Sequence, residues 1–584
     1  MDTFHGIPVS PGVAIGKALV LHSEDFFSVP KAEIKLEEVP KEIVRFEESL
    51  TQTRSELFGI RKKIAQDLGH EHSDIFSAHL LILEDRTLIE DVLSKIKEEH
   101  VPAEYAFSVV IQRYFHAFAQ INDEYLKERV ADIKDVGKRI LLNLKGEKKD
   151  SLVSLKEKVI VIAHDLSPSE TAMMDRRHVI AFATDIGGPT SHTAIMARSM
   201  EIPAVVGVDR ISLEISNGDM LIIDGNRGLV ILDPDPLAID RYMREEKRFV
   251  ELVSELDKLK TLAAETLDGR QMQLMANIEF PDEIPSVLAH GAEGIGLYRT
   301  EYFYMNRTDL PTEQEQFEAY RHVAERLAPK PVVVRTLDLG GDKFLSSLDL
   351  PRELNPFMGW RAIRFCLARV DIFKSQLRAI LKASSHGNLK LMYPMISNLV
   401  ELKRANQILE EAKEELRHEK VPFDEDLEIG AMIEIPSAAL TSDALAREVD
   451  FFSIGTNDLI QYSLAVDRVN EKIAYLYEPA HPAILKLIQQ TIQNAKKANV
   501  WVGVCGEMAG DPAMALLLLG FGVDQLSMSS FALPKIKKTI RSVTFKEARE
   551  TAMRALEFTT GDEIKRFCET KLKTIIPELF ESQT

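Results

Sequence analysis

Eight short apolar runs in the second half of the chain place the strongest constraint on its fold. They lie at residues 272–276, 294–298, 332–335, 390–393, 430–433, 451–454, 501–504 and 525–528, with helical patterns between them. Short apolar runs are typical of strands that are buried on both faces, and strands that alternate with helices form parallel sheets. Eight such units within about 315 residues predict a TIM (β/α)8 barrel.

The first half of the chain has a different organisation. Strand-like runs occur at 6–22, 159–163, 179–182, 204–206 and 221–223, and helical stretches separate most of them, which indicates an α/β domain. Between them, apolar residues such as Ile43, Phe46, Leu50 and Leu57 recur at helical spacing, which predicts an inserted helical bundle. We therefore expect a multidomain α/β protein. Its parts are an α/β domain at 1–33 and 148–230, a helical insertion at 34–147, a linker helix at 231–265 and the barrel at 266–584.

Composition narrows the functional classes. The 584 residues include 72 Lys+Arg and 91 Asp+Glu, a net charge of −19, which argues against nucleic-acid binding and against a basic membrane-surface site. The three cysteines are too few and too scattered for a disulfide framework. No secretory signal is visible, and the longest apolar run, 513–523, is too short to span a bilayer. We expect a soluble cytoplasmic protein.

Polar residues stand where the predicted barrel strands end, which is the active-site edge of such barrels. They are Asn277, Arg299, Arg335, Glu434, Asn457, Asp458 and Cys505, and Arg361 and Arg468 follow in the next loops or helices. Two carboxylates, Glu434 and Asp458, suit one Mg²⁺. The arginines suit phosphate and carboxylate groups, and Lys343 adds a further cation. Together these residues predict a small substrate that carries both a phosphate and a carboxylate. Taken singly, each charged residue is more typical of a surface ion pair, and Cys505 is more typical of a buried thiol.

A second candidate site lies at residues 185–198, whose letters are DIGGPTSHTAIMAR. Gly187 and Gly188 permit a tight turn, and Thr190 or Ser191 can cap a helix whose first turn carries His192. A helix N-terminus favours a phosphoryl group, and neutral imidazole is a nucleophile that accepts one. A solvent-facing histidine near a helix start fits the same pattern, so both interpretations stay open on the motif alone.

Taken in order, these motifs resemble one family of enzymes. The segment 187–198 resembles the phosphohistidine segment of the phosphoenolpyruvate-protein phosphotransferases, the enzyme I family of the bacterial sugar phosphotransferase system. The barrel segments 294–301 (GIGLYRTE), 335–343 (RTLDLGGDK), 355–364 (NPFMGWRAIR), 450–458 (DFFSIGTND) and 505–507 (CGE), and the helical segment 123–138, are similar to the same family. The resemblance runs from residue 6 to about residue 558.

The resemblance implies a role for each candidate residue. His192 would be phosphorylated on Nε2 by phosphoenolpyruvate, and Cys505 would protonate the enolate that becomes pyruvate. Arg299, Arg335 and Arg468 would bind the substrate, with Asn457 at the phosphate, while Glu434 and Asp458 would bind Mg²⁺. It also implies that the helical insertion docks the carrier protein HPr, which takes the phosphoryl group, and that the barrel forms a homodimer.

One position departs from the family pattern. Pro189 stands where the family commonly carries Arg, which makes the loop stiffer and one cation poorer.

Three other functions compete with this interpretation. A dikinase shares both modules but needs a nucleotide-binding domain, for which the helical insertion is too small. An enzyme I of a regulatory, nitrogen-related phosphorelay would use the same chemistry. A plain Mg²⁺-dependent lyase barrel would leave His192 and the first 230 residues without a role.

Overall fold

The computed structural model forms two compact units, Met1–Glu251 and Leu252–Glu581. It describes residues 2–21, 29–67, 79–80, 82–119, 124–146, 155, 157–166, 170–171, 174, 177–188, 193–194, 197, 202–304, 309–340, 355–468, 470 and 472–580. Among the described helices, none combines the length and the apolar character that crossing a bilayer requires.

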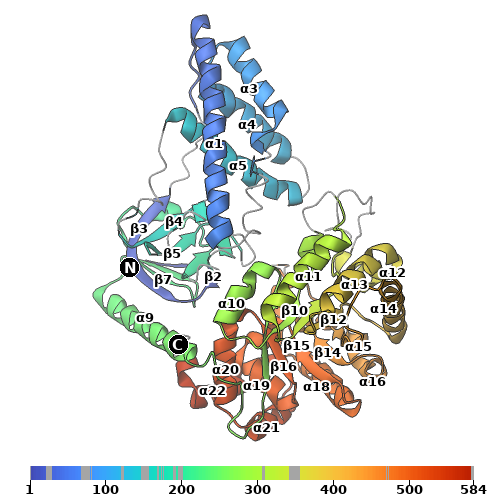
Figure 1. The fold of residues 1–584 in the computed structure, drawn as a ribbon. Coiled ribbons are helices and arrows are strands. Elements are labelled where there is room, and N and C mark those ends of the chain that lie inside the picture. Colours follow the sequence, from blue (N-terminus) through green and yellow to red (C-terminus); the bar gives the residue numbers. More distant parts are fainter. Residues whose placement is uncertain are drawn as a thin grey trace. The chain divides into compact units, whose positions relative to one another are not determined.

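The first unit contains an eight-stranded sheet with the order β1-β8-β7-β3-β4-β5-β6-β2 (Figure 1). Strands β3 to β6 pair in parallel, and the remaining pairs are antiparallel. The bounds are β1 (Asp2–His5), β2 (Ile7–Ser10), β3 (Val13–Leu21), β4 (Val159–Ala163), β5 (Val179–Thr184), β6 (Ala204–Val206), β7 (Met220–Asp224) and β8 (Leu229–Leu232), with α8 (Ile211–Glu214) after β6. Strands β1 and β8 are absent from the sequence expectation, and the expected domain limit at residue 230 falls inside β8.

Gly6 brings the two edges of this sheet together. Strands β1 and β2 lie at opposite edges, yet Gly6 alone separates them in the chain, so the sheet must curl. The Gly6 N–H donates to the Gly228 carbonyl at 2.8 Å, and a Cβ on Gly6 would stand 2.7 Å from the Val206 carbonyl oxygen. Only glycine fits this junction without a shift of the backbone.

Both faces of the sheet are covered. Val161 and Phe182 belong to the core on one face, and Ile160 and Ala181 belong to the core on the other. Because successive strand residues point to opposite faces, a strand that is buried on both sides reads as an uninterrupted apolar run. This is why 159–163 and 204–206 are strands with the expected bounds.

Helices fill the chain between β3 and β4. They are α1 (Val39–Asp67), α3 (Arg86–Glu99), α4 (Ala103–Ala119) and α5 (Glu124–Lys145), and Figure 1 shows them gathered into a bundle. Phe46, Leu57, Val92, Phe107 and Val136 are fully buried in a core of their own. After β8, the long helix α9 (Pro236–Asp257) follows, and the division between the two units falls within it.

The second unit is a closed barrel of eight parallel strands in the order β10-β11-β12-β13-β14-β15-β16-β9. The strands are β9 (Gln273–Ile278), β10 (Ile295–Tyr298), β11 (Val332–Arg335), β12 (Leu389–Tyr393), β13 (Ile429–Ile433), β14 (Phe451–Ile454), β15 (Trp501–Val504) and β16 (Gln525–Met528). All eight predicted strands are present, four of them with the predicted bounds, and the expected fold class is confirmed.

Helices surround the barrel on the outside. They are α10 (Ile284–Ala289), α11 (Glu313–Leu327), α12 (Ala362–Ala368), α13 (Val370–Ser384), α14 (Leu399–Glu419), α15 (Pro436–Leu440), α16 (Ser442–Leu445), α17 (Thr456–Leu464), α18 (Pro482–Lys497), α19 (Pro512–Phe521), α20 (Leu533–Arg541), α21 (Phe545–Ala555) and α22 (Gly561–Ile575). Short 3-10 turns include η4 (Glu301–Phe303) and η7 (Glu507–Gly510). A separate apolar cluster, which includes Leu297, Val333, Met432 and Cys505, fills the barrel interior. The barrel is therefore a packed core, and its loops are left to carry function.

Candidate active site at the barrel mouth

The carboxyl ends of the barrel strands gather most of the residues that the sequence singled out. Arg335 ends β11, Arg299 and Glu434 directly follow β10 and β13, and Cys505 directly follows β15. Asn457 and Asp458 lie in the first turn of α17, just after β14. Because all eight strands are parallel, these ends meet at one edge of the barrel.

Three carboxylates form a tight acidic cluster at this edge. Asp338, Glu434 and Asp458 each offer an oxygen, and these oxygens lie within 4.8 Å of one another. Glu434 is 2% exposed, and its Oε1 accepts a hydrogen bond from the Met395 N–H at 2.6 Å. Burial, together with the negative charges of Asp458 and Asp338, raises the pKa of Glu434 to about 8. A divalent cation would relieve this repulsion, so the donor set fits a metal of the Mg²⁺ type.

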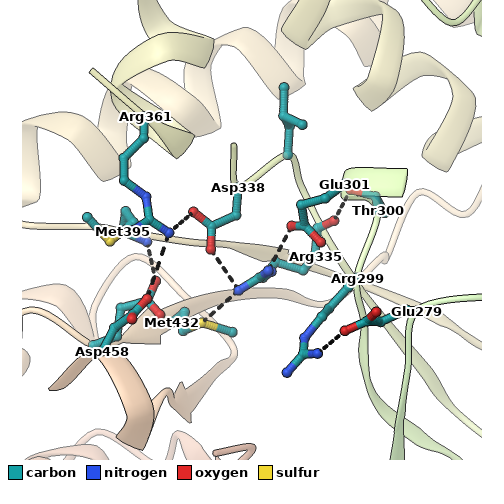
Figure 2. A network of polar contacts seen from close by, with 12 residues as sticks. Glu279, Arg299, Thr300, Glu301, Arg335, Asp338, Arg361, Met395, Met432 and Asp458 are labelled. Carbon is teal, nitrogen blue, oxygen red and sulfur yellow. Dashed lines mark hydrogen bonds and ion pairs between the residues drawn. The ribbon is translucent and has the colours of Figure 1, made fainter. Parts of the chain in front are cut away.

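Two arginines stand against the acidic cluster (Figure 2). Arg335 donates to Glu301 at 2.7 Å, and its Nη1 lies 2.9 Å from Asp338. Arg361 donates to Asp338 at 2.7 Å and lies 3.8 Å from Asp458. Burial lowers the pKa of the Arg335 guanidinium, but Glu301, Asp338 and Glu434 raise it more, so it remains charged.

Two more arginines of the predicted set pair with exposed carboxylates. Arg299 bonds Glu279, whose side chain is 52% exposed. Arg468 donates to Glu507 at 2.6 Å, and the Glu507 side chain is 73% exposed. The Glu507 N–H also donates to Asn457 Oδ1 at 3.0 Å, which links Asn457 to the same group. A small anion that enters the site would compete with these solvent-facing carboxylates for the two arginines.

Cys505 lies at the edge of the apolar interior. It is 4% exposed, and its Sγ is 3.8 Å from the Ile454 carbonyl oxygen. Burial raises the pKa of the thiol to about 11, so the thiol is protonated at neutral pH. Asn277 Nδ2 donates to the Cys505 carbonyl at 2.9 Å, so Asn277 supports the backbone here.

His192, Pro189 and Lys343 lie outside the described residues, but the flanks of the histidine loop are described. Asp185 accepts hydrogen bonds from the Ser212 hydroxyl at 2.6 Å and the Ser212 N–H at 2.8 Å, and it lies 2.9 Å from His164 Nδ1. On the other side, Thr193 Oγ1 donates to the Leu166 carbonyl at 3.2 Å. Asp185 is therefore anchored to α8 and to the segment that follows β4, and Thr193 is anchored to the segment that follows β4.

Four acidic residues of the site, Glu279, Glu301, Asp338 and Glu507, were not predicted from the sequence. Asp338, Glu301 and Glu507 lie inside segments that were quoted as motifs, at 335–343, 294–301 and 505–507. All four acidic residues come within three residues of a strand end, which is the signal that could have found them. Their partners, Arg299, Arg335, Arg361 and Arg468, come from other strands or loops, so the pairings required the fold.

Fold and site together define a class: barrel enzymes that act on a small phosphorylated carboxylate and carry a separate α/β domain. Family models agree with this class. Residues 253–545 match the PEP-binding domain of PEP-utilising enzymes, residues 5–129 match their N-terminal domain, and residues 155–228 match their mobile domain.

Whole-length relatives identify the family. The chain is 47% identical over 565 residues to the phosphoenolpyruvate-protein phosphotransferase of Bacillus sp. (strain S), covering 97% of each chain. It is also 47% identical to the protein of that name from Geobacillus stearothermophilus, with 97% of each chain covered. The Staphylococcus aureus protein of the same name is 46% identical, with 96% of this chain and 97% of the relative covered. The chain belongs to the phosphoenolpyruvate-protein phosphotransferase family, as its motifs predicted, and is a transferase.

Proposed function

We propose that this protein transfers the phosphoryl group of phosphoenolpyruvate to its own His192, and from there to a histidine of the carrier protein HPr, with release of pyruvate. This is the first step of the sugar phosphotransferase system. The observation that carries the proposal is the meeting of four arginines and three carboxylates at the barrel mouth. Such a set matches a small substrate with a phosphate and a carboxylate.

The acidic cluster is the proposed Mg²⁺ site. Glu434 and Asp458 hold the metal, and Asp338 lies close enough to add a third oxygen. When bound, Mg²⁺ supplies positive charge to phosphate and enolate oxygens. Few protein ligands are needed, since this ion usually keeps coordination positions for substrate and water.

The arginines bind and orient the substrate in this proposal. Arg299, Arg335 and Arg468 hold the phosphate and carboxylate, with Asn457 at the phosphate. Arg361 and Lys343 add positive charge beside it. Glu279 and Glu507 give up their arginines when the substrate arrives, which is feasible because both carboxylates face solvent. Preorganised positive charge of this kind is the main catalytic device in phosphoryl transfer.

The chemical step needs His192 and Cys505. Nε2 of neutral His192 attacks phosphorus, the N–P bond forms, and the bond from phosphorus to the enol oxygen breaks. The leaving enolate takes a proton at carbon from the Cys505 thiol and becomes pyruvate, and the thiolate regains a proton from solvent. The raised pKa of Cys505, about 11, supports a thiol that carries its proton at neutral pH.

The remaining assignments concern partners and domains. HPr docks on the helical insertion at 34–147, the α/β domain at 1–33 and 148–230 carries His192, and 231–265 links it to the barrel at 266–584, which forms the homodimer. The three cysteines, Cys366, Cys505 and Cys568, are buried and unpaired. Free thiols support a reducing compartment, and we place the protein in the cytoplasm.

The deciding experiment is phosphorylation of His192→Ala by phosphoenolpyruvate labelled with ³²P in the presence of Mg²⁺. We expect stable protein label on the wild type and none on the variant, because the acceptor nitrogen is gone. His178→Ala, in the turn before β5, is the matched control and should take label as the wild type does. Stable label on His192→Ala would overturn the assignment.

A further inference from the structure

Gln376 is a buried amide behind the barrel mouth, outside the set of residues that meet the substrate. It lies on α13 and is 1% exposed. Its Oε1 accepts a hydrogen bond from the Leu337 N–H at 2.9 Å, and its Nε2 donates to Thr300 Oγ1 at 3.0 Å and to the Tyr320 hydroxyl at 3.2 Å. One side chain thus contacts two strand ends and one neighbouring helix.

The two strand ends that Gln376 contacts carry Arg299, Arg335 and Asp338. Thr300 follows Arg299 directly, and Leu337 precedes Asp338 directly. Thr300 Oγ1 in turn donates to the Arg335 carbonyl at 2.9 Å, so the chain of hydrogen bonds runs from Gln376 through Thr300 to Arg335. A shift of either segment would move Arg299, Arg335 or Asp338 relative to the others.

Burial makes this arrangement rigid. Thr300 and Tyr320 are fully buried, and Gln376 is almost so. Polar groups in such surroundings keep their partners because leaving one unpaired is costly. The third hydrogen-bond partner of Gln376 is Tyr320 on α11. The Tyr320 hydroxyl also donates to Gln316 Oε1 on the same helix at 3.2 Å, away from the barrel mouth.

We propose that Gln376 is a positioning residue, which sets the placement of the segments after β10 and β11 and thereby the geometry of Arg299, Arg335 and Asp338 for substrate binding. This inference deepens the proposed function and rests on it, because the ligand whose binding is set is phosphoenolpyruvate. Small misplacements of binding groups lower the efficiency of an enzyme strongly even where the fold persists.

The test uses three variants of the full-length protein. Gln376→Met keeps the volume and removes all three hydrogen bonds, and Thr300→Val removes the link to the Arg335 carbonyl. Tyr320→Phe is the matched control, because it breaks a bond to the same amide but leaves both strand-end contacts. We expect Gln376→Met and Thr300→Val to raise KM for phosphoenolpyruvate at least about fivefold, a size typical of misplaced binding groups.

The control separates positioning from stability. All three variants should melt at a lower temperature, but Tyr320→Phe should keep the wild-type KM. If Gln376→Met and Thr300→Val raise KM no more than Tyr320→Phe does, the positioning role is wrong. If Gln376→Met does not fold, Thr300→Val compared with Tyr320→Phe decides the question.

Calorimetric binding of phosphoenolpyruvate with Mg²⁺ distinguishes this inference from the proposed function. If the wild-type protein binds phosphoenolpyruvate but takes no label, the proposed function is wrong. The dissociation constants of the same three variants then test the role of Gln376 alone. A wild-type protein that does not bind the compound overturns both.

Discussion

Asp338 lies where the arginines and the acidic cluster meet. It contacts Arg335 and Arg361 while its carboxylate stands beside those of Glu434 and Asp458. Burial raises the pKa of both Asp338 and Glu434, but the two arginines reverse the shift for Asp338, whose pKa is lowered. Burial and repulsion by Asp458 and Asp338 instead raise the pKa of Glu434 to about 8.

Mg²⁺ binding should therefore depend on pH. At pH values below the pKa of Glu434, which is about 8, the Glu434 carboxyl carries a proton. A metal ion that binds there must displace this proton. We expect the affinity for Mg²⁺ to rise about tenfold per pH unit from about pH 6.5, and to level off above about pH 8.5. Calorimetric titration at several pH values measures this.

Two variants refine that titration. Asp338→Asn removes one negative neighbour, so the pKa of Glu434 should fall and the affinity should level off at a lower pH. Glu507→Gln, outside the acidic cluster, should leave the profile unchanged. An affinity for Mg²⁺ that is the same at about pH 6.5 and about pH 8.5 would rule out Glu434 as the ligand that exchanges a proton for the metal.

Among the helices, α19 accounts for the longest apolar run in the sequence. Every residue of α19 is buried, and the helix packs against α20, α21 and α22 of the barrel. The approach to α21 is close at Gly520, where an added Cβ would stand 2.2 Å from the Ala548 carbonyl oxygen and 2.7 Å from Ala552 Cβ. A run that is apolar on all sides is thus explained by burial within the barrel unit.

Gly520→Ala should destabilise the barrel, because the backbone of α21 cannot yield to the new methyl group without repacking. We expect the free energy of unfolding to fall by about 1–3 kcal/mol. Both tryptophans, Trp360 and Trp501, lie in the barrel unit, so their fluorescence in urea follows this unit.

Gly59→Ala is the contrasting substitution. Gly59 lies on α1 with no atom within 4 Å of the added Cβ, so alanine should stabilise that helix by up to about 1 kcal/mol. Because α1 belongs to the first unit, the tryptophan transition should not move. A Gly520→Ala protein as stable as the wild type would contradict the close packing of α19 on α21.

Across the whole chain, the two proposed reaction centres belong to different compact units. Residue 192 falls in Met1–Glu251, whereas the arginine and carboxylate groups fall in Leu252–Glu581. The proposed relay therefore requires His192 to reach the barrel mouth and, later, the proposed carrier HPr. The segment through α9 is the covalent connection between the units.

A fragment that lacks the barrel should exchange phosphate with HPr but should not react with phosphoenolpyruvate. A fragment of residues 1–265, which keeps α9 whole, should accept the phosphoryl group from phosphorylated HPr but not from phosphoenolpyruvate, because it lacks the arginines. Radiolabel transfer measures both reactions, and the same fragment with His192→Ala should accept no label from either donor. Label taken by the wild-type fragment directly from phosphoenolpyruvate would refute the two-centre scheme.

The printed sequence was sufficient for the barrel, for the carboxyl ends of seven of its eight strands and for the family; β9 extends two residues beyond its predicted end, so Asn277 lies inside it. Strands such as β11, β14, β15 and β16 are short apolar runs between helical patterns, and local pattern and order along the chain suffice to recognise them. Glu434, Asp458, Arg299 and Arg335 were found in the same way, because parallel strands bring their carboxyl ends to one edge. Strands β1 and β8 were missed because each has only four residues, too few for a clear pattern, and their pairing with each other joins the two ends of the unit.

What the sequence could not supply is which side chains meet. That Asp338 joins two arginines, that the pKa of Glu434 is raised, and that Gln376 bonds to two strand ends follow from contacts between residues that are between 3 and 120 positions apart in the chain. Periodicity reports only whether a residue faces a core or solvent. Contact energies and pKa shifts depend on the distance and burial of specific atoms, and these are set when the barrel closes and brings distant strands together.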